Sequence, residues 1–126
     1  TTLHYIDPEI DTGDIIARKS VDAEPVDTGK TLYEKLEQAT LELFKETWSA
    51  IASGSVSRVE QRKEEGTDLR TADVEEIDEI DLDEKYTARR LINILRARTF
   101  PPHESAYFEE DGEKVYVRID LEYERE

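Results

Sequence analysis

A histidine and several carboxylates lie close together in the first fourteen residues of the chain. His4 and Asp11 are seven positions apart, and their acidic neighbours are Asp7, Glu9 and Asp14. A histidine and a carboxylate that meet on one rim can perform general acid–base catalysis or stabilise a developing charge. The same residue types also fit a structural role, in which the histidine has a satisfied hydrogen bond and the aspartate closes a turn. Neither a nucleophile nor a glycine-rich phosphate loop lies nearby.

Two short strands around a turn would bring this histidine and this aspartate together. Residues 2–6 alternate between apolar and polar types, as a half-buried strand does, and residues 14–21 predict a second strand. Between them, Pro8 restricts the backbone and Gly13 permits a positive φ, which is typical of turns. If the two strands flank one another, both side chains reach the same rim.

The next segment carries the strongest helical pattern of the chain. Thr31 and Glu34 have the spacing of a capping box, Thr28 is an alternative N-cap, and Gly54 is expected to end the helix. Apolar residues recur at helical spacing and predict one long amphipathic helix that lies on a core. The buried face is expected to contain Leu32, Leu36, Ala39, Leu43, Thr47 and Ala50, widened by Tyr33, Thr40, Phe44, Trp48 and Ile51.

The pattern weakens between residues 55 and 83. Residues 57–62 are compatible with a short strand, and an acidic connector with isolated apolar anchors follows. Its aspartates do not provide the ligand register of an EF-hand with the required glycine, so we predict no metal site there. The expected anchors are Val74, Ile77, Ile80 and Leu82.

A second helix and a hairpin are expected after the connector. Asp83 is the predicted N-cap, and the pair Pro101-Pro102 ends the helix. Residues 106–123 form two alternating runs around an Asp-Gly pair, which favours a two-residue hairpin turn. We expect the helix to bury Ala88, Leu91, Ile92 and Leu95, and the hairpin to be packed by Tyr107, Phe108, Tyr116 and Tyr123.

The composition restricts the classes of partner. The chain has 126 residues, 32 of them acidic and 17 basic, and a net charge of −15. Such a surface repels phosphate backbones and anionic membranes, so nucleic-acid binding is disfavoured. The sequence has no cysteine, no secretory signal and no apolar run near the roughly 20 residues of a membrane span. We therefore expect a cytoplasmic protein, and the acid excess is typical of adaptation to a high-salt cytoplasm.

The opening segment resembles a known enzyme family. The stretch "TLHYIDPEIDTGDIIARK", followed by "DTGKTLYEKLEQATLELF", is similar to the second half of the catalytic domain of the folate-dependent formyltransferases. The family signature is a strand histidine, six residues, then Asp-x-Gly-x-Ile, and it matches His4, Asp11, Gly13 and Ile15. The family includes methionyl-tRNA formyltransferase, glycinamide ribonucleotide transformylase and the sugar-nucleotide N-formyltransferases.

The resemblance implies an α/β fold in three parts. Residues 1–54 are expected to be the C-terminal part of a formyltransferase-like, Rossmann-type catalytic domain. Residues 55–83 are expected to be an acidic connector, and residues 84–126 a small helix–hairpin subdomain. The absence of methionine and a start inside an expected strand favour a chain that lacks its front end.

The resemblance also implies the reaction and the roles of the loop residues. Members transfer a formyl group from the cosubstrate 10-formyltetrahydrofolate to a primary amine. Asp11 matches the catalytic aspartate, which orients the catalytic histidine and assists proton transfer, and His4 matches a histidine that supports the loop. The residues implied to lie against the pterin are Tyr5, Ile6, Asp7, Glu9, Ile10, Asp11 and Gly13.

The chain departs from the family in one respect. The catalytic asparagine and histidine of the family belong to an Asn-x-His motif upstream, and the sequence contains no such motif. Its only other histidine is His103, and its only asparagine is Asn93 in the second predicted helix. We expect this chain alone to be inactive, because orientation and oxyanion stabilisation are missing, and to need the N-terminal half of the catalytic domain as a partner.

The C-terminal segment indicates a branch of the family. An acidic connector takes the place of the basic linker of methionyl-tRNA formyltransferase, and "ARRLINILRARTFPPHESAYFEEDGEKVYVRI" is similar to the sugar-nucleotide N-formyltransferases. A nucleotide-linked amino sugar is therefore the expected small-molecule substrate. Two alternatives stay open: the methionyl-tRNA or purine branch, and a non-catalytic module that keeps the fold and binds a partner.

One helical stripe of the second helix is basic. Arg89, Asn93 and Arg96 share it, and Arg98 lies beyond. The stripe fits a solvated face that pairs with the abundant carboxylates. It also fits a contact with an anionic substrate or with the missing half.

Overall fold

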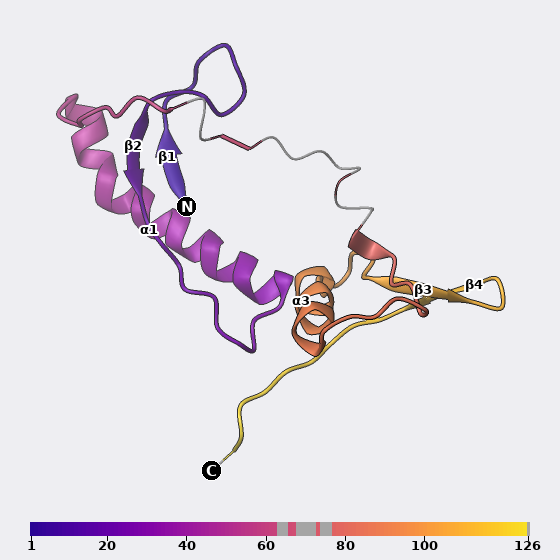
Figure 1. Ribbon diagram of the computed structural model, residues 1–126. Helices are drawn as coiled ribbons and strands as arrows, with labels where there is room; N and C mark the ends of the chain where they lie inside the picture. The colour runs from indigo at the N-terminus through magenta and orange to yellow at the C-terminus, as the bar shows by residue number, and fades with distance from the viewer. Residues whose placement is uncertain (63–65, 68–72, 74–76, 126) are drawn as a thin grey trace. The chain divides into compact units, whose positions relative to one another are not determined.

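The computed structural model describes residues 1–62, 66–67, 73 and 77–125. The chain divides into two compact units, and each is described by itself. Unit 1 comprises Thr1–Asp22 and Glu34–Asp68, and unit 2 comprises Ala23–Tyr33 and Leu69–Glu126. In chain order the main elements are β1, β2, α1, α3, β3 and β4 (Figure 1).

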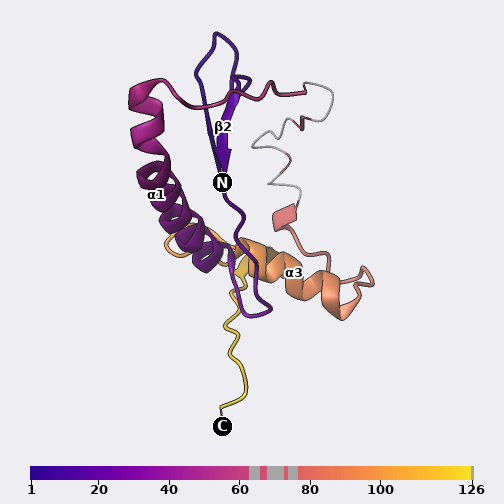
Figure 2. The same cartoon turned by 90° about the vertical axis from the view of Figure 1, so that its left-hand side faces the viewer.

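Unit 1 is built on a short hairpin. β1 (Thr2–His4) pairs antiparallel with β2 (Ile15–Arg18), with a register irregularity between Leu3 and His4. Both strands were expected and are confirmed, but they are shorter than 2–6 and 14–21. The hairpin lies alongside α1 (Figures 1 and 2), where the hydroxyls of Thr1 and Thr40 are 2.7 Å apart.

The base of the β1–β2 connection is tight. The Tyr5 N–H donates to the carbonyl oxygen of Asp14 at 2.9 Å, which closes the loop. A Cβ at Gly13 would overlap the Tyr5 carbonyl group, so this position excludes every residue except glycine. The expected strand over residues 57–62 is reduced to one antiparallel bridge, between Ile15 and Val59.

α1 spans Gly29–Ser53. It begins about one turn earlier than it would if Thr31 were its N-cap. Thr28 is the N-cap, and the prediction that Thr31 caps the helix is wrong. The two threonines bond reciprocally: the Thr28 N–H donates to Thr31 Oγ1 at 2.9 Å, and the Thr31 N–H donates to Thr28 Oγ1 at 3.4 Å. Thr31 therefore takes the place that Glu or Gln has in a capping box.

The C-terminal end of α1 confirms the predicted stop. Gly54 has a φ of 70°, its N–H donates to the Ile51 carbonyl oxygen at 3.1 Å, and the Ser55 N–H donates to the Ala50 carbonyl oxygen at 2.9 Å. These two bonds form a Schellman motif, which satisfies carbonyl groups that the helix leaves open.

The buried face of α1 is narrower than predicted. Ala39 and Leu43 are buried, as expected. Phe44 and Trp48 were expected to widen the buried face, and this prediction is wrong. Their side chains are 44% and 54% exposed, so Trp48 is not a core residue. Position 44 is rotated by about 100° from position 43 on a helix, which turns these rings away from the buried stripe. The two rings contact each other, with centroids 5.4 Å apart.

Unit 2 contains α3 (Ala88–Arg98), and its N-cap is Thr87, whose hydroxyl accepts the Arg90 N–H at 3.1 Å. The prediction of Asp83 as the cap is wrong, because the N–H of Asp83 donates to the carboxylate of Asp81 in a separate turn. The helix ends before Pro101, as predicted.

The packing of α3 and of the connector differs from the prediction. Leu91 and Leu95 are half-buried, but Ala88 is exposed and Ile92 is 41% exposed, so the buried stripe covers less of the helix. Of the predicted anchors, Ile80 is half-buried, Ile77 and Leu82 are about half exposed, and Val74 lies outside the described residues.

The predicted Asp-Gly hairpin is confirmed. β3 (Tyr107–Glu110) and β4 (Glu113–Tyr116) pair antiparallel around Asp111 and Gly112, whose φ angles are 53° and 80°. Two consecutive positive φ angles are typical of a type I′ turn. The strand ends at Tyr116 and does not continue to residue 123.

The aromatic residues of the hairpin pack only in part. The rings of Tyr107 and Tyr116 are 5.9 Å apart, and Lys114 Nζ lies 4.1 Å from the centroid of the Tyr107 ring. A hydrogen bond to Tyr107 raises the pKa of Lys114. Tyr123 is 56% exposed, so its predicted packing is wrong. Among the described residues, no helix is long and apolar enough to span a membrane.

One ion-pair group joins the hairpin of unit 1 to α1. Lys19 Nζ lies 3.0 Å from carboxylate oxygens of Glu42 and of Glu46. Hydrogen bonds to these two carboxylates raise the pKa of Lys19. A hydrogen bond from Gln38, followed by one from Lys19, lowers the pKa of Glu42.

The pKa of Glu42 yields a test. Because it is lower in the folded chain, its contribution to stability is present above the ordinary pKa and is lost as the pH falls through the folded value. Lys19→Met should raise the pKa of Glu42, and Gln38→Leu should do the same. Carboxyl ¹³C NMR titration measures both, and Lys45→Met, which removes a weaker influence, should change it least. Equal effects of the three variants would contradict this account.

The steric constraint at Gly13 yields a second test. Gly13→Ala should lower the free energy of unfolding by about 3 kcal/mol or more, because the methyl group has to displace backbone. The matched control is Gly54→Ala, where nothing lies within 4 Å of the added Cβ. That control should lose only about 1 kcal/mol from its left-handed backbone. Urea unfolding compares them, and similar losses would refute the close approach.

Candidate functional site

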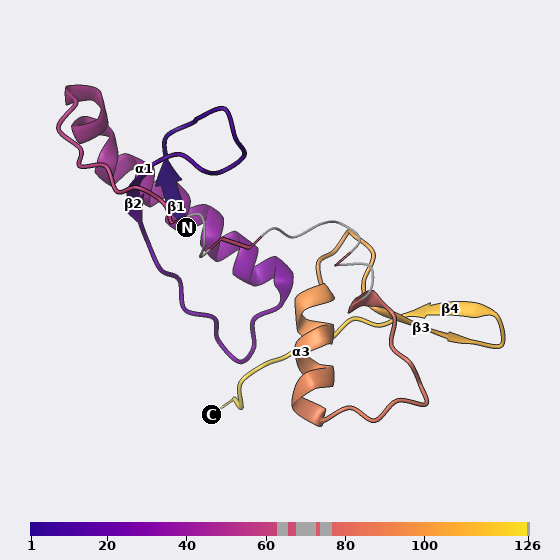
Figure 3. The same cartoon turned by 45° about the horizontal axis from the view of Figure 1, so that its top comes forward.

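The loop of residues 5–14, here named the Asp11 loop, brings the predicted histidine and aspartate together. His4 Nε2 lies 3.5 Å from Asp11 Oδ1, and the two side chains are 27% and 84% exposed. The expected meeting on one rim is therefore observed. The loop extends beyond the strands that carry it (Figure 3), and the exposed fraction of Asp11 shows that its carboxylate is accessible.

The second nitrogen of the ring specifies the chemistry of the pair. His4 Nδ1 lies 2.8 Å from the Tyr5 carbonyl oxygen, which can only accept, so Nδ1 carries the proton. In a neutral ring, Nε2 is then an acceptor and faces an acceptor on Asp11. An attractive contact requires a proton on Nε2 as well. Nε2 therefore faces the carboxylate, the arrangement in which a histidine orients a neighbouring aspartate.

The backbone of Asp11 is left-handed, with a φ of 55°. Aspartate adopts this backbone region more readily than most residues, but less readily than glycine. The neighbouring turn is held by Asp7, whose carboxylate accepts the Glu9 N–H at 3.0 Å and the Thr12 hydroxyl at 2.6 Å. Asp7 therefore has a structural role in the loop.

Two apolar side chains of the loop are almost fully exposed. Ile6 is 95% exposed and Ile10 is 90% exposed, although isoleucine is among the residues most often buried. Two such side chains beside a reactive pair suit a flat organic ligand or a second protein segment. Among the described residues, no group of three or more His, Cys, Asp or Glu could hold a metal ion.

The sequence did not reveal two residues that contact the loop from behind. Arg58 Nε donates to Asp14 Oδ2 at 3.0 Å, and its guanidinium carbon lies 4.1 Å from the centroid of the Tyr5 ring. Gln61 donates to backbone carbonyl groups of the loop. Both lie more than forty positions from the loop, so no local pattern could have indicated the contact.

The predicted basic stripe of α3 separates into two groups. Arg96 donates to the backbone carbonyl oxygens of Asp27 at 2.7 Å and of Glu24 at 2.6 Å, and Arg98 pairs with Asp78. These two arginines support unit 2.

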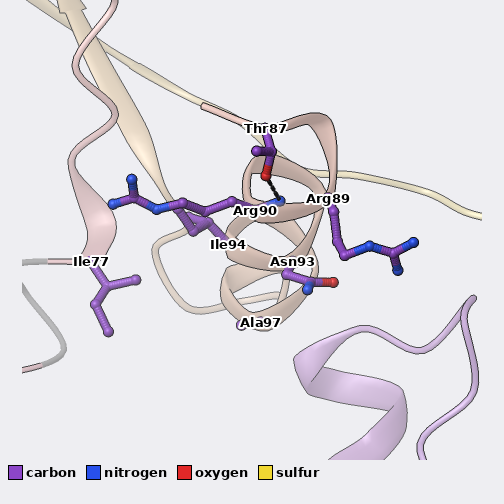
Figure 4. A pocket seen from close by; sticks show the side chains of 7 residues that line it. All are labelled: Ile77, Thr87, Arg89, Arg90, Asn93, Ile94 and Ala97. Atoms are coloured by element: carbon purple, nitrogen blue, oxygen red, sulfur yellow. Dashed lines mark hydrogen bonds between the residues drawn. The ribbon is translucent and has the colours of Figure 1, made fainter. Parts of the chain in front are cut away.

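Arg89 and Asn93 instead line an open hollow of about 470 Å³, with Ile77, Thr87, Arg90, Ile94 and Ala97 (Figure 4). Arg89 and Arg90 extend in opposite directions from the first turn of α3 (Figure 4). Arg90 pairs with Glu84, whereas Arg89 has no ion-pair partner among the described residues.

Comparison with known proteins gives a consistent result. Residues 73–123 match the N-formyltransferase dimerization C-terminal domain. A dTDP-4-amino-4,6-dideoxyglucose formyltransferase of Mycobacterium tuberculosis is 34% identical over 98% of this chain and 53% of its own length. The methionyl-tRNA formyltransferase of Bacillus subtilis is 30% identical over 92% of this chain and 35% of its own length.

Solved structures agree with these relatives. A 4-N formyltransferase from Francisella tularensis matches 97% of this chain and 50% of its own, with a TM-score of 0.90 and 36% identity. The formyltransferase PseJ from Anoxybacillus kamchatkensis matches 60% of this chain and 39% of its own, with a TM-score of 0.56 and 39% identity. That structure contains UDP-4,6-dideoxy-4-formamido-L-AltNAc and tetrahydrofolate.

The extent of these matches defines the relationship. The chain spans about half the length of the sugar formyltransferases that it matches. The resemblance expected from His4, Asp11, Gly13 and Ile15 is confirmed by matches that cover nearly the whole chain. The chain is thus related to the C-terminal part of the formyltransferases, and its residues 73–123 match their C-terminal dimerization domain.

Proposed function

We propose that this chain supplies the C-terminal part of an enzyme that transfers a formyl group from 10-formyltetrahydrofolate to the amine of a nucleotide-linked amino sugar. The observation that carries the proposal is the His4–Asp11 pair, which a fold shared with sugar formyltransferases presents on an accessible loop. The match covers 53% of the length of the sugar formyltransferase and 35% of the length of a methionyl-tRNA formyltransferase, and this difference favours an amino sugar over tRNA as the acceptor.

The Asp11 loop is chemically suited to this role. The amine has to lose a proton as it attacks the formyl carbon, and Asp11 is a carboxylate positioned to accept it, directly or through water. His4 keeps that carboxylate on the rim and can hold the proton at Nε2. Ile6 and Ile10 offer an apolar surface that fits the flat pterin of the folate. The folate supplies the activated formyl group.

The remaining groups of the site have to come from elsewhere. The sequence contains no Asn-x-His motif, so oxyanion stabilisation requires a second segment that corresponds to the other half of the relatives. The exposed flank of α1, with Phe44 and Trp48, provides an apolar face that a Rossmann-type half would cover. The division into residues 1–54, 55–83 and 84–126 stays a prediction.

The alternative is a non-catalytic module that keeps the fold and binds a partner. The two readings differ in what Asp11 does. A binding module needs only the shape of the loop, whereas the enzyme needs a carboxylate at the end of that side chain.

The test compares the isolated chain with a complete enzyme. The 126-residue chain alone should show no turnover of 10-formyltetrahydrofolate with dTDP-4-amino-4,6-dideoxyglucose. Supplied with a segment that carries the Asn-x-His motif, it should transfer formyl to this amine and not to charged initiator tRNA. In that assembly, Asp11→Asn should lower kcat on the order of 10²–10⁴-fold, because a general base is lost.

A matched control keeps the loss interpretable. Asp22→Asn removes an exposed carboxylate outside the loop and should leave kcat unchanged. Turnover by the isolated chain would refute the requirement for a second segment. Full activity of the Asp11 variant would favour the binding module.

We also propose that residues 73–123 mediate self-association. The family description of this segment names dimerization. Within it, several large apolar side chains are between 41% and 56% exposed, and a partner surface would cover them. They are Ile77, Leu82, Ile92, Val115, Tyr116 and Tyr123.

The molar mass in solution tests this association. Sedimentation equilibrium should give about 29 kDa, twice the 14.6 kDa of one chain. Ile92→Glu and Val115→Glu should each shift the mass toward the monomer, because a buried, unpaired carboxylate opposes association. Phe44→Glu lies outside the segment and serves as the control. A dimer that tolerates both substitutions would place the interface elsewhere.

A further inference from the structure

The segment that follows α1 returns to the base of the Asp11 loop (Figures 1 and 3). Val59 and Ile15 exchange both backbone hydrogen bonds, at 2.7 Å and 3.0 Å. Ile15 is the first residue of β2 and is buried, so this bridge is anchored in the hairpin. It fixes where the residues on either side of Val59 lie relative to the loop.

Gln61 uses this position to bind the loop backbone. Its Nε2 donates to the carbonyl oxygen of Asp11 at 3.0 Å and to that of Gly13 at 2.6 Å. A primary amide has two N–H groups, and both are used. Only the amide nitrogen can make these bonds, because two carbonyl acceptors face it. The side chain thus joins the carbonyl groups of Asp11 and Gly13, two residues apart in the loop.

Arg58 holds the two ends of the same loop. It pairs with Asp14 at the C-terminal end and covers the ring of Tyr5 at the N-terminal end. It does not contact the backbone next to Asp11. Gln61 is therefore the described side chain outside the loop that acts on the peptide group of Asp11 itself.

That peptide group needs support. Asp11 has a φ of 55°, a left-handed conformation that glycine adopts more readily than any residue with a side chain. Its side chain is 84% exposed and is paired with His4. A backbone bond to the Asp11 carbonyl group from a half-buried side chain opposes relaxation of φ. Relaxation would turn the carboxylate away from His4.

We propose that Gln61 is a positioning residue for Asp11: its amide binds the backbone carbonyl groups of Asp11 and Gly13, holds Asp11 in its left-handed conformation, and thereby keeps the Asp11 carboxylate against His4. The inference rests on the proposed function for its catalytic meaning, but the positioning itself is a property of the folded chain. The site then includes Gln61, a residue of the segment after α1, in addition to the residues of the loop.

The experiment measures the backbone of Asp11 by NMR in the isotopically labelled 126-residue chain. A left-handed residue shows a strong intraresidue amide–Hα NOE, and the wild-type chain should show it at Asp11. Gln61→Ala and Gln61→Glu should lose it, because neither retains the two donors. Gln61→Lys should restore it, because an ammonium group brings three N–H donors to a similar reach.

The control is Gln38→Ala, which removes an exposed glutamine of α1 that bonds only Glu42 among the described residues. It should keep the NOE. Retention of the NOE in both Gln61→Ala and Gln61→Glu would overturn the proposal. So would failure of Gln61→Lys to restore it, since the loss would then reflect packing and not donation.

A kinetic measurement on the assembled enzyme gives the functional consequence. Gln61→Ala should lower kcat on the order of 10²-fold with little change in KM for the amine, because a displaced catalytic group affects the chemical step. A rise in KM for the amine with an unchanged kcat would overturn the positioning role. If wild-type assembly transfers no formyl group, the proposed function fails, and the NOE still decides whether Gln61 positions Asp11.

Discussion

The close approach of two backbone segments at the base of the Asp11 loop is the constraint on which the site depends. The Tyr5 carbonyl group lies where a Cβ of residue 13 would be, and the Tyr5 N–H bonds the carbonyl oxygen of Asp14. The loop therefore leaves the hairpin through a narrow base. Its end residues are determined by backbone geometry, and its outer residues are free to present side chains.

The interactions around this base fall into two layers. Inside the loop, the carboxylate of Asp7 binds the Glu9 N–H and the Thr12 hydroxyl and shapes the turn. Behind the loop, Arg58 and Gln61 bind its ends and its backbone from a segment that follows α1. The reactive pair itself is formed by exposed or half-buried side chains and is held by its surroundings. Surface ion pairs alone contribute about 0–1 kcal/mol, so backbone support matters more for the geometry of Asp11.

Both units expose large apolar side chains. In unit 1 they include Ile6 and Ile10 on the loop, Leu41, Phe44 and Trp48 on α1, and Val59 in the segment after α1. In unit 2 all of those in the described residues except Tyr33 fall within residues 73–123, the segment that matches a dimerization domain.

The sequence by itself determined the features that depend on local chemistry. Gly54 ends α1, Asp111 and Gly112 form the hairpin turn, and the spacing of His4 and Asp11 across a turn places them on one rim. Capping was harder, because Thr28, Thr31, Asp83 and Thr87 all have suitable side chains and only the observed hydrogen bonds choose among them.

The tertiary structure alone decided what depends on distant segments. It left Trp48 exposed, bound Arg96 to backbone carbonyl groups and brought Gln61 to the Asp11 loop. Periodicity shows which side of a helix is apolar but not how much of it a neighbouring element covers. Spacing likewise cannot indicate a hydrogen bond between residues fifty positions apart, because that contact exists only once β2 and the segment after α1 have paired.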